Sequence, residues 1–322
     1  MSWLAAFRSL QLAASLLLGG AIAFELLVLR RAAEAVRAPE LVEQVRRWLR
    51  TQGALGVVLG LFSWAAWLAA VTIGMTGLPA SEALVPENLG LVATRTTFGH
   101  VWVLRCILFL LLAIPLLSAQ AGRLRAARWL SGCAATVLLA SLAWTGHAVA
   151  SGAAHLAVDA AHVCAAAVWV GMLPPLGLLL LRACASGDAG CVRLAAATAR
   201  LFSPPAIAAV LTLVVTGSLS AWWLVGTPGR LLDTSYGLLL SSKLALFAGM
   251  LGFAACNRLL LTPRLASAQP ATAPSVRAMR LLGWNVLAEI ALAAALLGVV
   301  GTLGVTPPAT HEAPAHQHHH DD

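Results

Sequence analysis

The chain has 322 residues, of which 60% are hydrophobic and only 11% are charged, and its formal net charge is +8 at pH 7. Soluble domains carry about 25% charged residues, so this composition excludes an ordinary soluble protein and predicts a polytopic protein of the lipid bilayer. The positive charge does not predict nucleic-acid binding, because the arginines form short clusters between apolar runs, as they do in cytoplasmic loops of membrane proteins.

The apolar segments predict an all-α fold, a membrane bundle of eight transmembrane helices. The first run continues beyond the length of a signal-peptide core and meets Arg30 and Arg31, so we expect it to be a span and not a cleaved signal. The eight predicted spans are about 7–29, 54–76, 101–118, 129–148, 155–181, 204–225, 237–261 and 284–305.

The basic residues predict the orientation of this bundle. Most of them lie in the first, third, fifth and seventh loops between the predicted spans. Because loops rich in Lys and Arg stay in the cytoplasm, both termini are predicted to be periplasmic. We therefore expect a transmembrane domain over residues 1–305 and a histidine-rich periplasmic tail over 306–322.

In this topology all nine histidines map to the periplasmic side of the membrane. This segregation would not be expected of histidines scattered through a core, and it indicates a shared function. The histidines predicted to be metal ligands are His100 and His147 at the ends of spans three and four, His155 and His162 in span five, and His316 and His318 in the tail.

Span five carries the densest group of polar residues. His155, Asp159 and His162 follow i,i+4 and i,i+3 steps, so they share one stripe of a helix. Imidazole and carboxylate are good ligands for borderline divalent metals. However, His155 and His162 are separated by about 10.5 Å along a helix axis, so one ion would bridge them with difficulty. We expect His162 and Asp159 to form one corner of a site completed by His147 or His100, with His155 as an outer ligand.

Ionisable residues inside spans are costly and usually functional. Arg105 and Lys243 lie in the outer thirds of their spans, where either one could pair with Asp159 and compete with a bound cation. Glu25 and Glu289 lie toward the inner side, where they could pair with inner-loop arginines or line an exit path.

Four stretches resemble the copper resistance protein D (CopD) family of bacterial inner-membrane proteins. They are HLAVDAAHVCAAAVWVGMLPPL, RLFSPPAIAAVLTLVVTGSLSAWW, LLDTSYGLLLSSKLALFAGMLGFAACNRLLLTP and RLLGWNVLAEIALAAALLGVVGTLGVTPP. The likeness covers residues 140–308. Before that segment it depends on the number of spans and on His147.

The resemblance implies copper homeostasis at the inner membrane, with import from periplasm to cytoplasm and a periplasmic copper-binding protein as partner. It leaves the oxidation state, Cu(I) or Cu(II), open. The residues to which the family's functional roles transfer are His147, His162, Trp169, Tyr236, Lys243, Asn257 and Glu289.

Our leading hypothesis is a copper permease whose tail collects copper and whose outer-face site takes the ion. We do not expect an enzyme, because the sequence contains no nucleophile–base set or phosphate-binding loop. Two alternatives remain. One is a b-type haem protein linked to quinone, since outer-side histidine pairs can hold haem. The other is a non-transporting copper sensor or delivery factor.

Overall fold

The computed structural model describes residues 3–117, 125–145, 152–225, 234–267 and 273–306. Within these ranges the chain is helical and contains no strand, and eight helices are long and apolar enough to cross a membrane. Both the all-α fold and the eight predicted spans are thus confirmed. The spans are Trp3–Val36, Pro39–Thr76, Thr97–Leu117, Ala126–Trp144, Ala153–Ser186, Ala189–Trp223, Ser235–Leu265 and Val276–Leu303.

Several spans consist of more than one helical element, including π-helical turns η1 and η5 and the 3₁₀ turn η3. The elements are α1 (Trp3–Phe24), η1 (Glu25–Leu29), α2 (Arg30–Val36), α3 (Pro39–Thr76), α4 (Ala80–Ala83), α5 (Pro86–Arg95), α6 (Thr97–Leu117), α7 (Arg125–Ala140), η3 (Ser141–Thr145), α8 (Ala153–Trp169), α9 (Leu173–Ser186), α10 (Ala189–Val225), α12 (Ser235–Cys256), η5 (Asn257–Leu261), α13 (Thr262–Ser267) and α14 (Ala273–Leu303).

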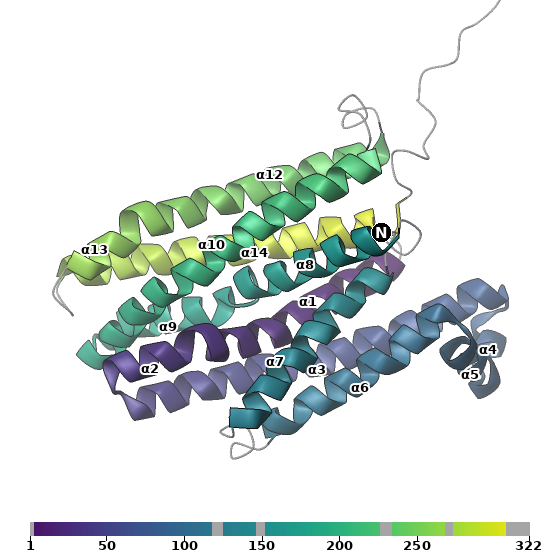
Figure 1. The fold of residues 1–322 in the computed structure, drawn as a ribbon, viewed down its shortest axis with the longest axis horizontal. Helices are drawn as coiled ribbons and strands as arrows, with labels where there is room; N and C mark the ends of the chain where they lie inside the picture. Colours follow the sequence, from purple (N-terminus) through teal and green to yellow (C-terminus); the bar gives the residue numbers. More distant parts are fainter. Residues whose placement is uncertain (1–2, 118–124, 146–151, 226–233, 268–272, 307–322) are drawn as a thin grey trace, which may run out of the picture.

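Helix α1 joins the two halves of the bundle. It packs against α3 and α7 of the first half and against α8 and α14 of the second half. Figure 1 shows α3, α6 and α7 on one side of α1 and the helices from α8 to α14 on the other. The beginning of α1 and the end of α14 lie together at one end, which we call the terminal end. Helices α2, α9 and α13 lie at the opposite end, which we call the arginine end.

The first basic segment is helical where the sequence predicted a loop over residues 30–53. Helix α2 fills its beginning, Arg37 adopts a left-handed conformation, and α3 starts at Pro39. Proline is well suited to the first turn of a helix, where its missing N–H is not needed. With 38 residues, α3 is about 57 Å long at 1.5 Å per residue. It therefore extends well beyond the hydrocarbon core, which is about 30 Å thick.

The fifth span is interrupted between α8 and α9, at Gly171. Two prolines follow in the first turn of α9, where they cannot continue the hydrogen bonds of α8. Gly20 of α1 lies directly against Gly171, so a Cβ added to Gly20 would overlap the Gly171 backbone. The Gln52 amide of α3 donates to the carbonyl oxygens of Leu17 at 2.9 Å and of Gly171 at 3.0 Å. Three spans are therefore fixed to one another at this point.

Replacing Gly20 with alanine is expected to destabilise the bundle by about 1–3 kcal/mol, because the new methyl group forces α1 away from Gly171. Gly74 of α3 is the matched control, since an added Cβ there has no neighbour within 4 Å. Gly74→Ala should leave stability unchanged or raise it slightly, because alanine favours helices. Thermal unfolding of the detergent-solubilised variants measures the difference, and equal midpoints would contradict the prediction.

Candidate metal site

The terminal pocket is a cavity of about 170 Å³ at the terminal end of the bundle. Its lining comes from α1, η3, α8, α10, α12 and α14, so only the folded bundle brings these side chains together. The polar residues that line it are Arg8, His155, Asp159, His162, Ser220, Tyr236 and Lys243.

His155 is buried with one ring nitrogen unpartnered. Its side chain is 3% exposed, and its ring lies 4.7 Å from the ring of Trp223. Nε2 is 3.9 Å from Oδ1 of Asp159, which also accepts a hydrogen bond from the Ser220 hydroxyl at 3.3 Å. Nδ1 has no hydrogen-bond partner among the described residues. Metal-bound histidines commonly direct their second nitrogen at a carboxylate, and His155 has this arrangement with Nδ1 left for a ligand.

The ring of His162 is oriented by a hydrogen-bond chain on α10. Its Nδ1 lies 2.8 Å from the Thr216 hydroxyl, which lies 2.6 Å from the carbonyl oxygen of Thr212. A carbonyl only accepts and a hydroxyl has one hydrogen, so Thr216 donates to Thr212 and accepts from Nδ1–H of His162. In the neutral ring this leaves the lone pair on Nε2, which is the form that binds metals.

Two cations share the terminal pocket with Asp159. Lys243 comes from α12 and Arg8 from α1, and both lie within electrostatic range of the Asp159 carboxylate. The Arg8 guanidinium also donates to the carbonyl of Gly304 at 3.4 Å. With neutral histidines, two cations and one carboxylate leave the pocket with a net positive charge. This charge disfavours a metal cation unless a basic group moves or loses its proton.

His100 and Arg105, which the sequence predicted on the outer side of the bundle, lie outside this pocket. His100 is exposed at the beginning of α6, where its Nε2 lies 2.9 Å from the carbonyl oxygen of Thr94. Arg105 is fully buried, and of the two cations that could pair with Asp159 it is the one that does not, because its guanidinium bonds groups of α1, α7 and η3. It donates to the Leu138 carbonyl at 2.6 Å, the Ser141 hydroxyl at 2.7 Å and the Ser15 hydroxyl at 2.8 Å.

The remaining predicted ligands, His147, His316 and His318, lie outside the described residues. Within the described part of the chain, no three His, Cys, Asp or Glu side chains are grouped so that they could hold one metal ion. His155, Asp159 and His162 therefore share one pocket but do not converge on a single ion position in this structure.

Sequence reasoning missed two groups that line the terminal pocket, Arg8 and Ser220, and it considered Thr216 only for a polar route through span six and not as the partner of His162. A signal was present for Ser220, because it lies one helical turn from Thr216. Arg8 precedes the first apolar run, so the sequence alone suggested an ordinary residue flanking the membrane.

A second polar cluster lies nearer the arginine end and contains three of the predicted residues. The Asn257 amide donates to Glu289 at 2.7 Å and accepts a hydrogen bond from Asn285 at 2.8 Å. Glu289 is 2% exposed. Trp169, Asn257 and Glu289 line a cavity of about 300 Å³, which we call the inner cavity.

A middle cavity lies between the terminal pocket and the inner cavity and measures about 310 Å³. It shares His162 and Lys243 with the terminal pocket, and it shares Trp169 with the inner cavity. The predicted functional residues of the second half of the chain therefore line a series of three adjoining cavities.

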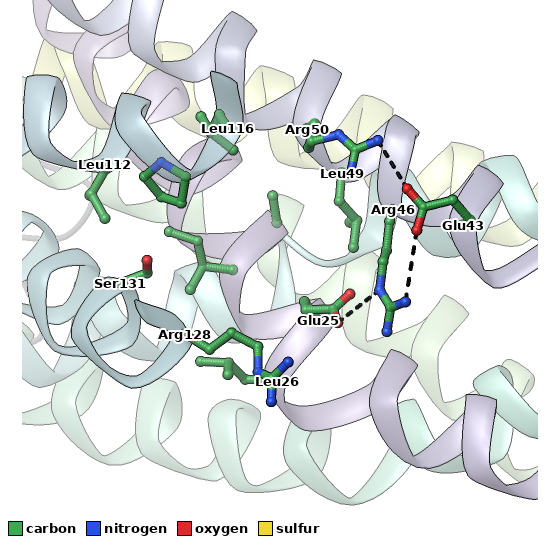
Figure 2. A pocket seen from close by; sticks show the side chains of 13 residues that line it. Glu25, Leu26, Glu43, Arg46, Leu49, Arg50, Leu112, Leu116, Arg128 and Ser131 are labelled. Carbon is green, nitrogen blue, oxygen red and sulfur yellow. Dashed lines mark hydrogen bonds and ion pairs between the residues drawn. The ribbon is translucent and has the colours of Figure 1, made fainter. Parts of the chain in front are cut away.

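Glu25, which the sequence analysis grouped with Glu289 on the inner side of the membrane, forms an ion pair in the first half of the bundle. Its Oε1 lies 3.2 Å from Nε of Arg46 on α3, and Figure 2 shows the two side chains facing each other. Of the two alternatives that the sequence left open for Glu25, the structure shows the pairing with an arginine of the first basic segment.

Comparisons with known proteins cover both halves of the chain. The family model described as Copper resistance protein D matches residues 196–303, and the model of the Copper resistance protein D-like N-terminal domain matches residues 1–156. The likeness therefore extends through the first half, where the sequence motifs were weakest. No solved structure gives a significant match.

Three curated relatives are similar over most of the chain. Copper resistance protein D of Pseudomonas syringae pv. tomato is 28% identical over 82% of this chain and 84% of that protein. Copper transport protein CutJ of Bacillus subtilis is 31% identical over 70% of this chain and 41% of that protein. Inner membrane protein YebZ of Escherichia coli K12 is 30% identical over 79% of this chain and 85% of that protein.

These matches agree with the eight apolar helices and with the motifs from residue 196 onward. The chain belongs to the copper resistance protein D family and is a multi-pass protein of the bacterial inner membrane.

Proposed function

We propose that the chain binds copper in the terminal pocket and imports it across the inner membrane. The observation that carries this proposal is the pair of histidine nitrogens left without a hydrogen-bond role, Nδ1 of His155 and Nε2 of His162, on residues that line the same pocket as Asp159. Imidazole nitrogens and carboxylate oxygens are suitable copper ligands. We propose His147 as the further ligand.

The positive-inside rule supports a periplasmic location for the terminal end, because the arginine clusters lie at the other end of the bundle. In this orientation the tail with His316 and His318 gathers copper ahead of the pocket. A periplasmic copper-binding protein would deliver the ion to the same end.

Lys243 is proposed to control occupancy of the pocket. Its ammonium and the copper ion compete for the Asp159 carboxylate, because both are cations within the same small cavity. Copper entry therefore requires that Lys243 move away or give up its proton. Lys243 also lines the middle cavity. If its ammonium moves into that cavity, it moves along the route that we propose for the ion.

The series of cavities supports a route through the second half of the bundle. An ion leaving His162 would enter the middle cavity, pass Trp169 and reach Glu289 in the inner cavity. Glu289 supplies a buried carboxylate to the inner cavity, beside the Asn257 amide. In this proposal the chain is a permease and not an enzyme, and no bond is made or broken in the cargo.

Thr216→Val is expected to weaken copper binding about 10- to 100-fold, because it removes the acceptor that orients His162 and leaves the ligand itself in place. His162→Ala should weaken binding at least as much. His100→Ala is the matched control, since His100 does not line the pocket. Chelator competition in detergent measures all three affinities. Equal losses in the Thr216 and His100 variants would contradict the site.

Lys243→Met is expected to tighten copper binding several-fold, because it removes a competing positive charge from the pocket. Lys243→Arg keeps the charge and should bind copper as the unmodified protein does. The same competition assay measures both variants. Weaker binding by Lys243→Met would show that Lys243 supports the copper site and does not compete with the ion.

Glu289→Gln is expected to retain copper binding and to slow copper uptake into proteoliposomes by tenfold or more, because the route loses its inner carboxylate. His162→Ala should lose both properties. Uptake by Glu289→Gln at the unmodified rate would overturn the route. Binding by the unmodified protein without lumenal copper would indicate a delivery factor, and a Soret absorption band would indicate the haem alternative.

A further inference from the structure

Arg105 of α6 is a fully buried cation whose hydrogen bonds reach three other elements of the bundle. Its Nη1 atom donates to the Leu138 carbonyl and the Ser141 hydroxyl, and its Nη2 atom donates to the Ser15 hydroxyl. Nη2 also lies 2.8 Å from the side-chain amide of Gln11, which meets it through the amide oxygen because a guanidinium can only donate. One planar group therefore joins α6 to α1, α7 and η3.

Each of the two serines bonds Arg105 as an acceptor, because its one hydrogen is used within its own span. The Ser141 hydroxyl donates to the Leu138 carbonyl at 2.7 Å. The Ser15 hydroxyl donates to the main-chain carbonyl of Gln11 at 2.8 Å. Leu138 lies in the last turn of α7, where carbonyls lack the partner that a continuing α-helix would supply. Arg105 therefore caps α7 at the point where it changes to η3.

The positive charge of Arg105 is more than a simple attachment between helices requires. No carboxylate of the described residues forms an ion pair with it, and its neighbours are neutral oxygens and the ring of Trp64. Buried charged groups can often be replaced by packed apolar side chains without loss of stability. What a guanidinium adds is direction, because its N–H groups form a rigid planar fork.

One of the elements that Arg105 bonds, η3, is a wall of the terminal pocket. Leu142 and Ala143 line the pocket, and they follow directly after Ser141. η3 has five residues, so a change in the direction of its first residue moves both of these side chains. The hydrogen bond from Arg105 to Ser141 therefore fixes where this wall lies.

Helix α1 is a second wall of the same pocket, to which it contributes Arg8 and Leu12. Arg8, Gln11 and Ser15 follow i,i+3 and i,i+4 steps, so Arg8 lies on the stripe of α1 that faces Arg105. Because Gln11 and Ser15 both accept from its guanidinium, Arg105 also sets the position of this stripe. Arg105 itself does not line the pocket.

We propose that Arg105 is a positioning residue for the terminal pocket. By bonding η3 and α1 at once, it sets the separation of these two walls and with it the space around His155 and His162. The consequence for copper rests on the function proposed above, whereas the geometric role depends only on the fold. Arg105→Met removes the N–H groups. Arg105→Lys keeps the charge but lacks the planar fork that reaches three elements at once.

The geometric role is tested without copper, on the full chain, by reaction of the histidines with diethyl pyrocarbonate followed by mass spectrometry. Buried His155 should react slowly in the unsubstituted protein, and exposed His100 serves as the internal reference. Arg105→Met and Arg105→Lys are each expected to raise the rate of His155 relative to His100 about tenfold, because the pocket opens locally. An unchanged ratio in a folded Arg105→Met protein would overturn the proposal.

Leu112→Ala separates positioning from a general loss of stability. It removes a buried side chain from the same helix and should lower the thermal midpoint, but Leu112 neither bonds Arg105 nor lines the terminal pocket. The ratio of the His155 and His100 rates should stay unchanged in this variant. An increase as large as that of Arg105→Met would overturn the proposal, because lost stability would then suffice.

Ser141→Ala tests the same bond if Arg105→Met does not fold. It should raise the rate of His155 several-fold, because η3 loses its bond to Arg105. Ser131→Ala is the matched control, since the Ser131 hydroxyl bonds the Ala127 carbonyl within α7 at 2.8 Å. Equal rates in the two serine variants would contradict the positioning role.

Chelator competition tests the consequence for copper. Arg105→Lys should bind copper about tenfold more weakly, as is typical when a group behind the ligands is lost, and Leu112→Ala should bind it normally. Absence of copper binding by the unsubstituted protein, together with a His155 rate that depends on Arg105, would refute the proposed function and leave the positioning role intact. Copper binding with a His155 rate that does not depend on Arg105 would refute the positioning role alone.

Discussion

The contact between Gly20 and Gly171 is the constraint on which the arrangement of the bundle depends. It brings the backbone of α1 against the break between α8 and α9, and Gln52 of α3 closes the contact with two hydrogen bonds to main-chain carbonyls. In a membrane, close packing of small residues and interhelical hydrogen bonds replace the hydrophobic effect as the source of helix association. The direction of α8, and with it the position of its histidines, follows from this contact.

The buried polar groups of this bundle fall into two classes. In one class the polar atoms have hydrogen-bond partners, and in the other a buried atom has none among the described residues. Arg105 illustrates the satisfied case, because it donates to three oxygens and its guanidinium lies 5.0 Å from the ring of Trp64. Such a group ties helices together and has little capacity left for a ligand. His155 illustrates the other case, since its Nδ1 atom is buried without a described partner. Because leaving such an atom unpaired costs free energy, this position is where a ligand is most favourable.

The sequence predicted the features that depend on local pattern. Run lengths predicted the eight spans, and helical spacing predicted that His155, Asp159 and His162 share one stripe, which the structure confirms by placing all three in one pocket. The sequence did not predict the features that depend on how the helices pack against one another. Arg105 and Lys243 looked equivalent, since both lie in the outer third of a span, yet packing turns only Lys243 toward Asp159. Likewise, nothing local to α1 indicated that Arg8 would line the same pocket.

The positive charge of the terminal pocket disfavours tight binding of a copper ion, but the transport function that we propose has a different requirement from storage. An ion must bind favourably enough to enter and weakly enough to leave. A pocket with Asp159 and two histidines alone would hold a cation without a means of release. Lys243, which lines both the terminal pocket and the middle cavity, supplies a charge that can take the place of the ion at Asp159 after it moves on. In the proposed transport cycle, competition between the two cations for one carboxylate therefore weakens binding and favours release.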